Sequence, residues 1–122
     1  MFDRIVVEFI DQSQQRYPTA GDWVHEDNTL VLKISRMSKE AFTYALTMHE
    51  LFEALSCKIN GISQESVDQF DMGIGANLDE PGDSDLAPYK LEHAWASVVE
   101  RVFIGAVGEH WLTYYAAFAD LE

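Results

Sequence analysis

Hydrophobic residues recur at two different periods along this chain, which indicates a mixture of helices and strands. Between residues 2 and 16, Ile5 and Phe9 lie four apart, a spacing that predicts a first helix ending before Pro18. Within residues 23–35, apolar and polar residues alternate on either side of a short polar turn. That alternation predicts a β-hairpin.

The remaining apolar segments have helical spacing and clear end signals. Ser38 is a good N-cap and Gly61 a good residue just past a helix end, so together they delimit one long helix. Ser63 begins another helix in the same way, and Gly108 ends a third. Helices are therefore predicted over four segments: 39–60, 64–72, 89–107 and 109–120.

The helical spacing also predicts which side chains are buried. The expected core residues of the last three helices are Val67, Phe70, Leu91, Trp95, Val98, Val102, Trp111, Leu112, Tyr115 and Phe118. Residues 73–88 have no periodicity and contain several Gly and Pro, so they are expected to form a long loop. The predicted fold class is α+β and mostly α, in a single domain over 1–122, with the hairpin preceding the long helix.

The net charge of the chain makes some classes of function less compatible with it than others. The chain has 122 residues, 8 Lys plus Arg against 21 Asp plus Glu, and a formal net charge of −13. Direct binding to nucleic acid or to an anionic membrane surface is disfavoured, because phosphate contacts need a basic surface. The single Cys57 is expected to be buried and cannot form an intramolecular disulfide. No apolar run approaches the ~18 residues of a membrane span, and the charged N-terminal segment does not resemble a signal peptide, so we expect a cytoplasmic protein.

The most informative residues lie in the segment 48–54, where an imidazole and two carboxylates interrupt an apolar helix. His49 and Glu53 are four apart and share one face, whereas Glu50 shares the wetter face with Lys58. Burying such groups costs several kcal/mol unless a partner compensates. A bound divalent cation or a simple His–Glu hydrogen bond would both compensate, and the helix alone does not separate the two.

A second helix repeats the pattern and favours the metal. His93 and Glu100 are seven apart on a largely apolar face of the helix predicted over 89–107. With His49 and Glu53 they supply enough donors for a three- or four-coordinate site. Zinc is the expected metal and another divalent ion the alternative. Asp71 and Glu92 are reserve ligands.

These residues resemble the zincin metallopeptidases, whose motif H-E-x-x-H provides two zinc ligands and a general base. His49 matches the first ligand and Glu50 the general base, while Glu53 occupies the position of the second His. By analogy, His93 is the third ligand, and Glu100 or Asp71 the fourth. The resemblance implies that zinc activates a water molecule, that Glu50 takes its proton, and that the substrate is a peptide or protein.

Two other function classes remain open. One is a metal-dependent nucleotide phosphohydrolase that resembles the all-α pyrophosphohydrolases, in which carboxylates on facing helices hold Mg²⁺. The other is a non-enzymatic acidic protein that binds a basic surface of a partner. A homodimer is compatible with all three. The loop 73–88 is expected to be a mobile cover over the site, with a passive connection as the alternative.

Overall fold

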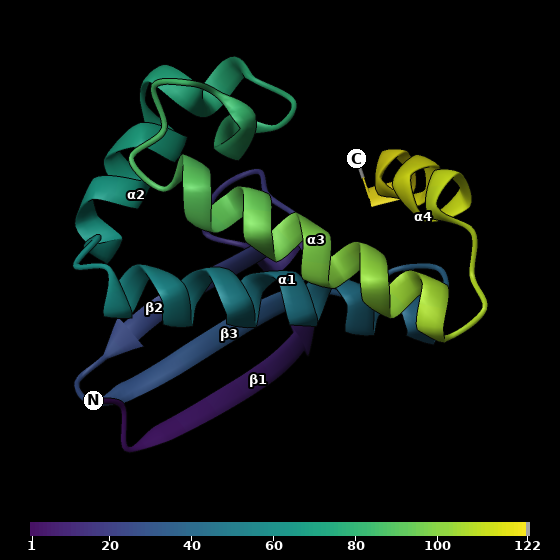
Figure 1. The fold of residues 1–122 in the computed structure, drawn as a ribbon, viewed down its shortest axis with the longest axis horizontal. Coiled ribbons are helices and arrows are strands. Elements are labelled where there is room, and N and C mark those ends of the chain that lie inside the picture. The colour runs from purple at the N-terminus through teal and green to yellow at the C-terminus, as the bar shows by residue number, and fades with distance from the viewer. Residues whose placement is uncertain (122) are drawn as a thin grey trace.

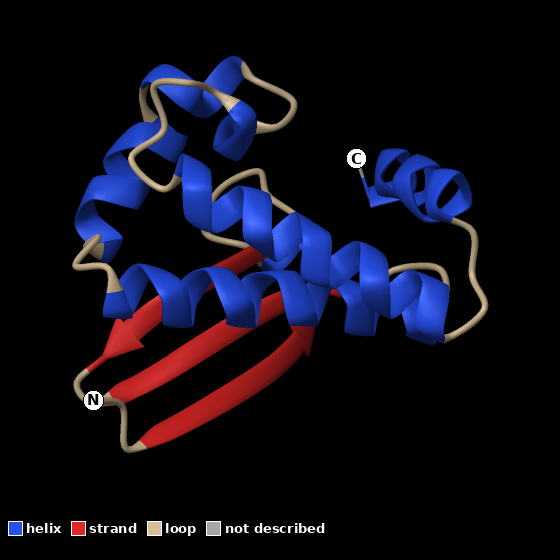
Figure 2. Ribbon diagram, in the orientation of Figure 1, coloured by secondary structure: helices blue, strands red, loops and turns tan. Residues whose placement is uncertain are grey.

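The computed structural model describes residues 1–121, which form a small sheet packed against a layer of helices (Figures 1 and 2). The strands are β1 (Arg4–Ile10), β2 (Gly21–Glu26) and β3 (Thr29–Ser35). The helices are α1 (Glu40–Ile59), α2 (Gln64–Met72), α3 (Lys90–Ala106) and α4 (Trp111–Ala117). Short 3₁₀ turns lie at Gln12–Gln14, Ile74–Asn77, Pro81–Asp83 and Phe118–Leu121. The fold is α+β and mostly α, as the sequence predicts.

The predicted helix over 2–16 is wrong, because its first half is strand β1. The sheet order is β1–β3–β2, with β1 parallel and β2 antiparallel to β3. Ile5 and Phe9 are four apart, but with Val7 between them they also alternate, and β-branched residues favour a pleated strand. Pairing of β1 with the central strand therefore overrides the helical spacing, and the expected hairpin is part of a three-stranded sheet.

The predicted hairpin and the helix that follows it are confirmed. Strands β2 and β3 are joined by a tight turn in which Asp27 has a φ of 57°. Helix α1 then crosses one face of the sheet (Figure 1), where Leu30, Leu32 and Ile34 of β3 are fully buried. The helix is preceded by Lys39 rather than capped by Ser38.

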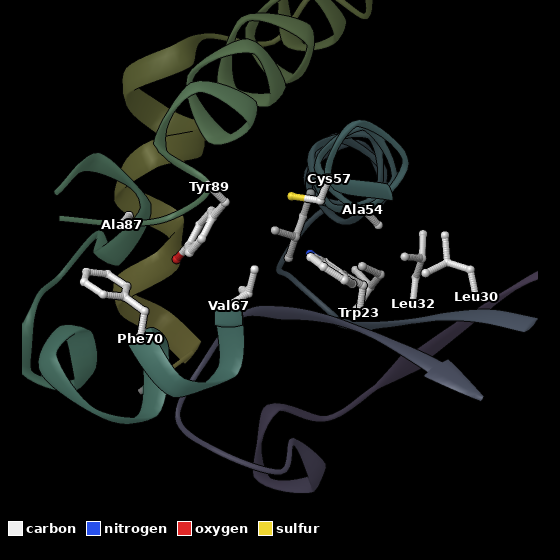
Figure 3. Close-up of a cluster of buried hydrophobic side chains, with 11 residues drawn as sticks. Trp23, Leu30, Leu32, Ala54, Cys57, Val67, Phe70, Ala87 and Tyr89 are labelled. Atoms are coloured by element: carbon white, nitrogen blue, oxygen red, sulfur yellow. The ribbon is translucent and has the colours of Figure 1, made fainter. Parts of the chain in front are cut away.

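The main apolar core lies between the sheet, α1, α2 and the start of α3. Figure 3 shows Trp23 and Leu32 of the sheet beside α1, with Val67 and Phe70 of α2 and Tyr89 completing the cluster. Val67 and Phe70 are therefore buried as expected. Helix α2 begins at the predicted cap, where the Ser63 side chain accepts a hydrogen bond from the Ser66 N–H.

Helix α3 packs along α1 (Figure 1), but it does so through the face that carries His93 and Glu100 and not through the stripe predicted to be its main buried one. The residues predicted to be its core are exposed: Leu91, Trp95, Val98 and Val102. Its buried residues are Glu92, His93, Ala96, Glu100 and Ile104. The physical reason is that the polar side chains of this face find partners on α1, at its C-terminal end, on α4 and in the loop 73–88, as described below.

The C-terminal helix packs differently from the prediction as well. Tyr114 is completely buried between α3 and α1, where it contacts Phe42 and Ile104. Leu112 and Tyr115, which were expected in the core, are exposed. Within residues 1–121, no helix is long and apolar enough to cross a membrane.

Candidate metal centre

Three of the predicted ligands converge on one point between α1 and α3. His49 and Glu53 lie on successive turns of α1, and His93 lies in the first turn of α3. One carboxylate oxygen, Glu53 Oε2, is 3.2 Å from His49 Nε2 and 3.1 Å from His93 Nδ1. Ligand atoms of the three side chains all lie within 4.8 Å of one another, and the three residues are buried.

Outer hydrogen bonds orient two of these side chains toward the centre. The second ring nitrogen of His49, Nδ1, lies 2.8 Å from Glu100 Oε1. The other oxygen of Glu100 accepts a hydrogen bond from the buried Tyr114 hydroxyl. The second oxygen of Glu53, Oε1, accepts one from the Trp23 indole N–H at 3.1 Å. A carboxylate behind a histidine is the usual arrangement that fixes the orientation of a metal-binding imidazole.

The electrostatics of the cluster favour a cation. Burial would lower the pKa of His49, but the hydrogen bonds with Glu100 and Glu53 outweigh it and hold that pKa well above its ordinary value. Burial likewise opposes ionisation of Glu53, but hydrogen bonds with His49 and His93 lower its pKa to about 2. Without a metal, His49 therefore carries a proton on the nitrogen that faces Glu53. A divalent cation could replace that proton, and the donor set of two imidazoles and one carboxylate suits zinc.

Glu50 lies beside the cluster, but its predicted exposure is wrong. Its side chain is 8% exposed, because strand β2 passes directly over it. A Cβ atom at Gly21 would lie 2.7 Å from the Glu50 side chain, so only glycine lets the strand come this close. Among the described residues, Glu50 forms no hydrogen bond or ion pair. Burial, and then the charge of Glu53, raise its pKa well above the ordinary value.

The other predicted ligands lie outside the cluster and have different partners. Both oxygens of Glu100 are occupied by His49 and Tyr114, so Glu100 supports a ligand and is not positioned as one. Asp71 accepts hydrogen bonds from the Tyr17 and Tyr89 hydroxyls, and burial raises its pKa to about 6.

The reserve ligand Glu92 is also turned away from the cluster. Its carboxylate accepts a hydrogen bond from the Asn60 side chain at 2.7 Å, at the far end of α1. Glu92 precedes His93 in the sequence, but the helix rotates the two side chains apart, so that only His93 reaches the convergence point.

The loop 73–88 supplies two site residues that the sequence did not single out. A Cβ atom at Gly82 would overlap the His93 ring, so this glycine permits the loop to lie directly against the imidazole. Asp83 Oδ1 is then 3.3 Å from His93 Nε2. Glu80, Asp83 and His93 form a second group whose ligand atoms are close together. The loop was expected to lie over the site, but no local pattern singled out Gly82 or Asp83 within it.

The cluster lies in the wall of a cavity of about 860 Å³. Glu50, Glu53, His49 and His93 all line it, together with the loop that carries Gly82. Nine of the lining residues carry a carboxylate, and among the described residues none is Lys or Arg. The three converging donors and Glu50 therefore all face one cavity, which is where a small-molecule or peptide ligand would reach them.

Comparison with known proteins adds no identification. No family model, no curated protein and no solved structure matches this chain. The functional argument therefore depends on the geometry of the cluster.

Proposed function

We propose that this protein is a zincin-like metal hydrolase that cleaves a peptide or amide bond. His49, Glu53 and His93 hold a divalent transition metal, with zinc as the preferred ion. The observation that carries the proposal is the convergence of two imidazole nitrogens on one oxygen of Glu53, at 3.2 and 3.1 Å, in the wall of a cavity. A structural His–Glu pair alone would not need a second histidine from another helix.

Glu50 is the residue that we assign as the general base. When bound, zinc would supply a Lewis acid that polarises a carbonyl group and acidifies water. Glu50 is ionised once a divalent cation is bound nearby, because a neighbouring positive charge opposes the effect of burial on its pKa. In that form it can accept a proton from water. Among the described residues Glu50 has no hydrogen-bond partner, so both of its oxygens are free for this role.

Two further residues orient the proposed ligands. Glu100 holds the His49 ring through Nδ1, so that Nε2 faces the centre. Trp23 holds one oxygen of Glu53 and leaves the other at the convergence point. Glu53 replaces the second histidine of the zincin motif, so the ligand set carries one more negative charge. We therefore expect bound water to be less acidic than in a site with three histidines.

The alternative functions receive less support from the same geometry. A magnesium-dependent phosphohydrolase would need oxygen ligands and a cation to meet phosphate, whereas two of the three converging donors are nitrogens. Among the described residues, the cavity lining has no Lys or Arg. An acidic protein-binding domain needs no buried cluster at all, and metal content distinguishes it from the hydrolase. The cytoplasmic location stays a prediction from the sequence pattern.

The test combines metal analysis with two amide substitutions in protein purified without an affinity tag. We expect about one zinc per chain in the wild type. Glu50→Gln should keep the zinc and lose hydrolysis of a peptide mixture, measured by mass spectrometry of the products. Glu53→Gln should weaken zinc binding strongly. Glu65→Gln, a substitution on the exposed surface of α2, is the matched control and should change neither property.

Two results would contradict the proposal. One is wild-type protein without stoichiometric metal whose melting temperature does not respond to added zinc. The other is a reversal of the roles, in which Glu50→Gln removes the metal while Glu53→Gln retains it. Metal bound without any hydrolysis would leave the metal site standing and refute the catalytic part.

A further inference from the structure

Strand β1 is an edge strand that nothing covers within residues 1–121 (Figure 2). The other edge strand, β2, is protected, because the side chain of Gln64 in α2 accepts a hydrogen bond from the His25 N–H at 2.6 Å. The backbone groups of β1 that point away from β3 have no comparable partner in the described chain. Unprotected edges of this kind pair readily with another strand.

The face of β1 that continues the core is apolar and partly open to solvent. Ile5, Val7 and Phe9 are 46%, 37% and 37% exposed, although they are in register with the fully buried Leu30, Leu32 and Ile34 of β3. Helix α1 covers β3 and leaves β1 half covered. The strand contains no Pro and no Lys, two residues that commonly prevent edge-to-edge pairing, and its only charged residues are Arg4 and Glu8.

The opposite face of β1 carries two charges that suggest which strand pairs with it. Arg4 and Glu8 are both exposed, and neither has an ion-pair partner among the described residues. Four residues along a strand correspond to about 13 Å, so the two cannot reach each other within one chain. In an antiparallel pair of two β1 strands with Val6 on the two-fold axis, Arg4 of each copy lies opposite Glu8 of the other.

We propose that β1 pairs antiparallel with β1 of a second copy, so that two three-stranded sheets join into one six-stranded sheet. The same register places Ile5 of one copy opposite Val7 of the other on the inner face. Both α1 helices then lie on the same side of the joined sheet and cover the apolar residues between them. The pairing is independent of the metal centre, which lies between α1 and α3 and contacts the other edge strand, β2.

A charge-reversal cycle on the full chain tests this register. Arg4→Glu and Glu8→Arg each place like charges opposite one another, and we expect each to raise the dissociation constant of the dimer about tenfold or more. The double variant restores opposite charges and should recover wild-type affinity. Its net charge equals that of the wild type, so the comparison tests only the placement of the charges. Sedimentation velocity over a range of concentrations measures the association. Unchanged far-UV circular dichroism verifies that each variant is folded.

One further variant tests the apolar face of β1, and another tests the exposed apolar face of α3 as an alternative interface. Val7→Asp, on the inner face of β1, should abolish the dimer. Trp95→Glu, in the exposed apolar face of α3, should leave it intact. The proposal is overturned if the wild type is monomeric at all concentrations or if the double variant associates as weakly as the single ones. It is equally overturned if Trp95→Glu dissociates the dimer and the β1 variants do not, because α3 would then be the interface.

Discussion

The two faces of helix α3 differ in burial, and the stripe that was expected to be its main buried one is the exposed one. The face that packs on α1 holds Glu92, His93, Ala96, Glu100 and Ile104, and the face toward solvent holds Leu91, Trp95, Val98 and Val102. An ordinary amphipathic helix would be turned the other way round. In this fold the four apolar side chains are exposed, while a histidine and two carboxylates are buried.

Paired partners explain why that orientation is stable. Each buried polar side chain of α3 has a hydrogen-bonding partner on another element: Glu92 has Asn60, His93 has Glu53, and Glu100 has His49 and Tyr114. An unpaired buried polar group would cost about 1–3 kcal/mol. Exposed apolar patches such as the opposite face of α3 commonly mark sites of interaction.

The largest expected effect is on zinc affinity, and it distinguishes the two faces of α3. His93→Ala removes a proposed ligand, whereas Trp95→Ala removes a larger side chain only two residues away on the opposite face. We expect His93→Ala to lower zinc affinity by more than about 100-fold, which exceeds the usual loss of a residue that only supports a ligand. Trp95→Ala should leave the affinity unchanged. Competition with a chromophoric zinc chelator measures both constants.

Equal losses in the two variants would contradict this view of α3. So would retention of zinc by His93→Ala, because the metal would then be held by α1 alone. The melting temperature of each metal-free variant provides the control for folding.

The second effect concerns stability and compares two aliphatic residues of α3. Ile104 is 1% exposed and packs against Phe42 and Tyr114, whereas Val102 is 66% exposed. Ile104→Ala should lower the free energy of unfolding by about 2–5 kcal/mol. Val102→Ala should change it by less than about 0.5 kcal/mol. Urea denaturation of the metal-free protein measures both, and a larger loss for Val102→Ala would show that α3 is turned the other way.

Local patterns were enough to predict much of this fold. The hairpin has a short polar turn and strict alternation, and the cap at Ser63 acts between neighbouring residues, so both could be read without knowing the rest of the molecule. Strand β1 could not, because the spacing of Ile5 and Phe9 fits both a helix and a strand. Only pairing with β3, about 25 residues later in the register, decides between them.

The sequence predicted three residues of the candidate site but not their surroundings, and it wrongly added Glu100 and Asp71 as ligands. His49, Glu53 and His93 stood out because each interrupts an apolar helical face, and the structure brings them together. The burial of Glu50 depends on Gly21, whose missing side chain admits β2, and a single sequence does not show that contact. The approach of Gly82 to His93 depends in the same way on how a long loop folds back.

The smallest expected effect is a shift in the pH dependence of zinc binding, and it tests the role of Glu100 on the buried face of α3. Zinc must displace the proton on His49, whose pKa is held well above its ordinary value. When the pH is lowered, zinc affinity should therefore begin to decrease before the pH reaches ~6.5, the ordinary pKa of histidine. Glu53, with a pKa of about 2, stays ionised throughout this range.

Glu100→Gln removes the carboxylate that raises the pKa of His49, so the imidazole should lose its proton at lower pH than in the wild type. The midpoint of the affinity loss should then move to lower pH, while the affinity at high pH falls about 10–100-fold because the ring is less firmly oriented. Glu92→Gln, on the same buried face but bonded to Asn60, is the matched control and should leave the midpoint in place. Chelator competition at a series of pH values provides the measurement. A midpoint that is the same in the wild type and in Glu100→Gln would mean that Glu100 does not control the proton on His49, and the buried face of α3 would then contribute His93 alone to the centre.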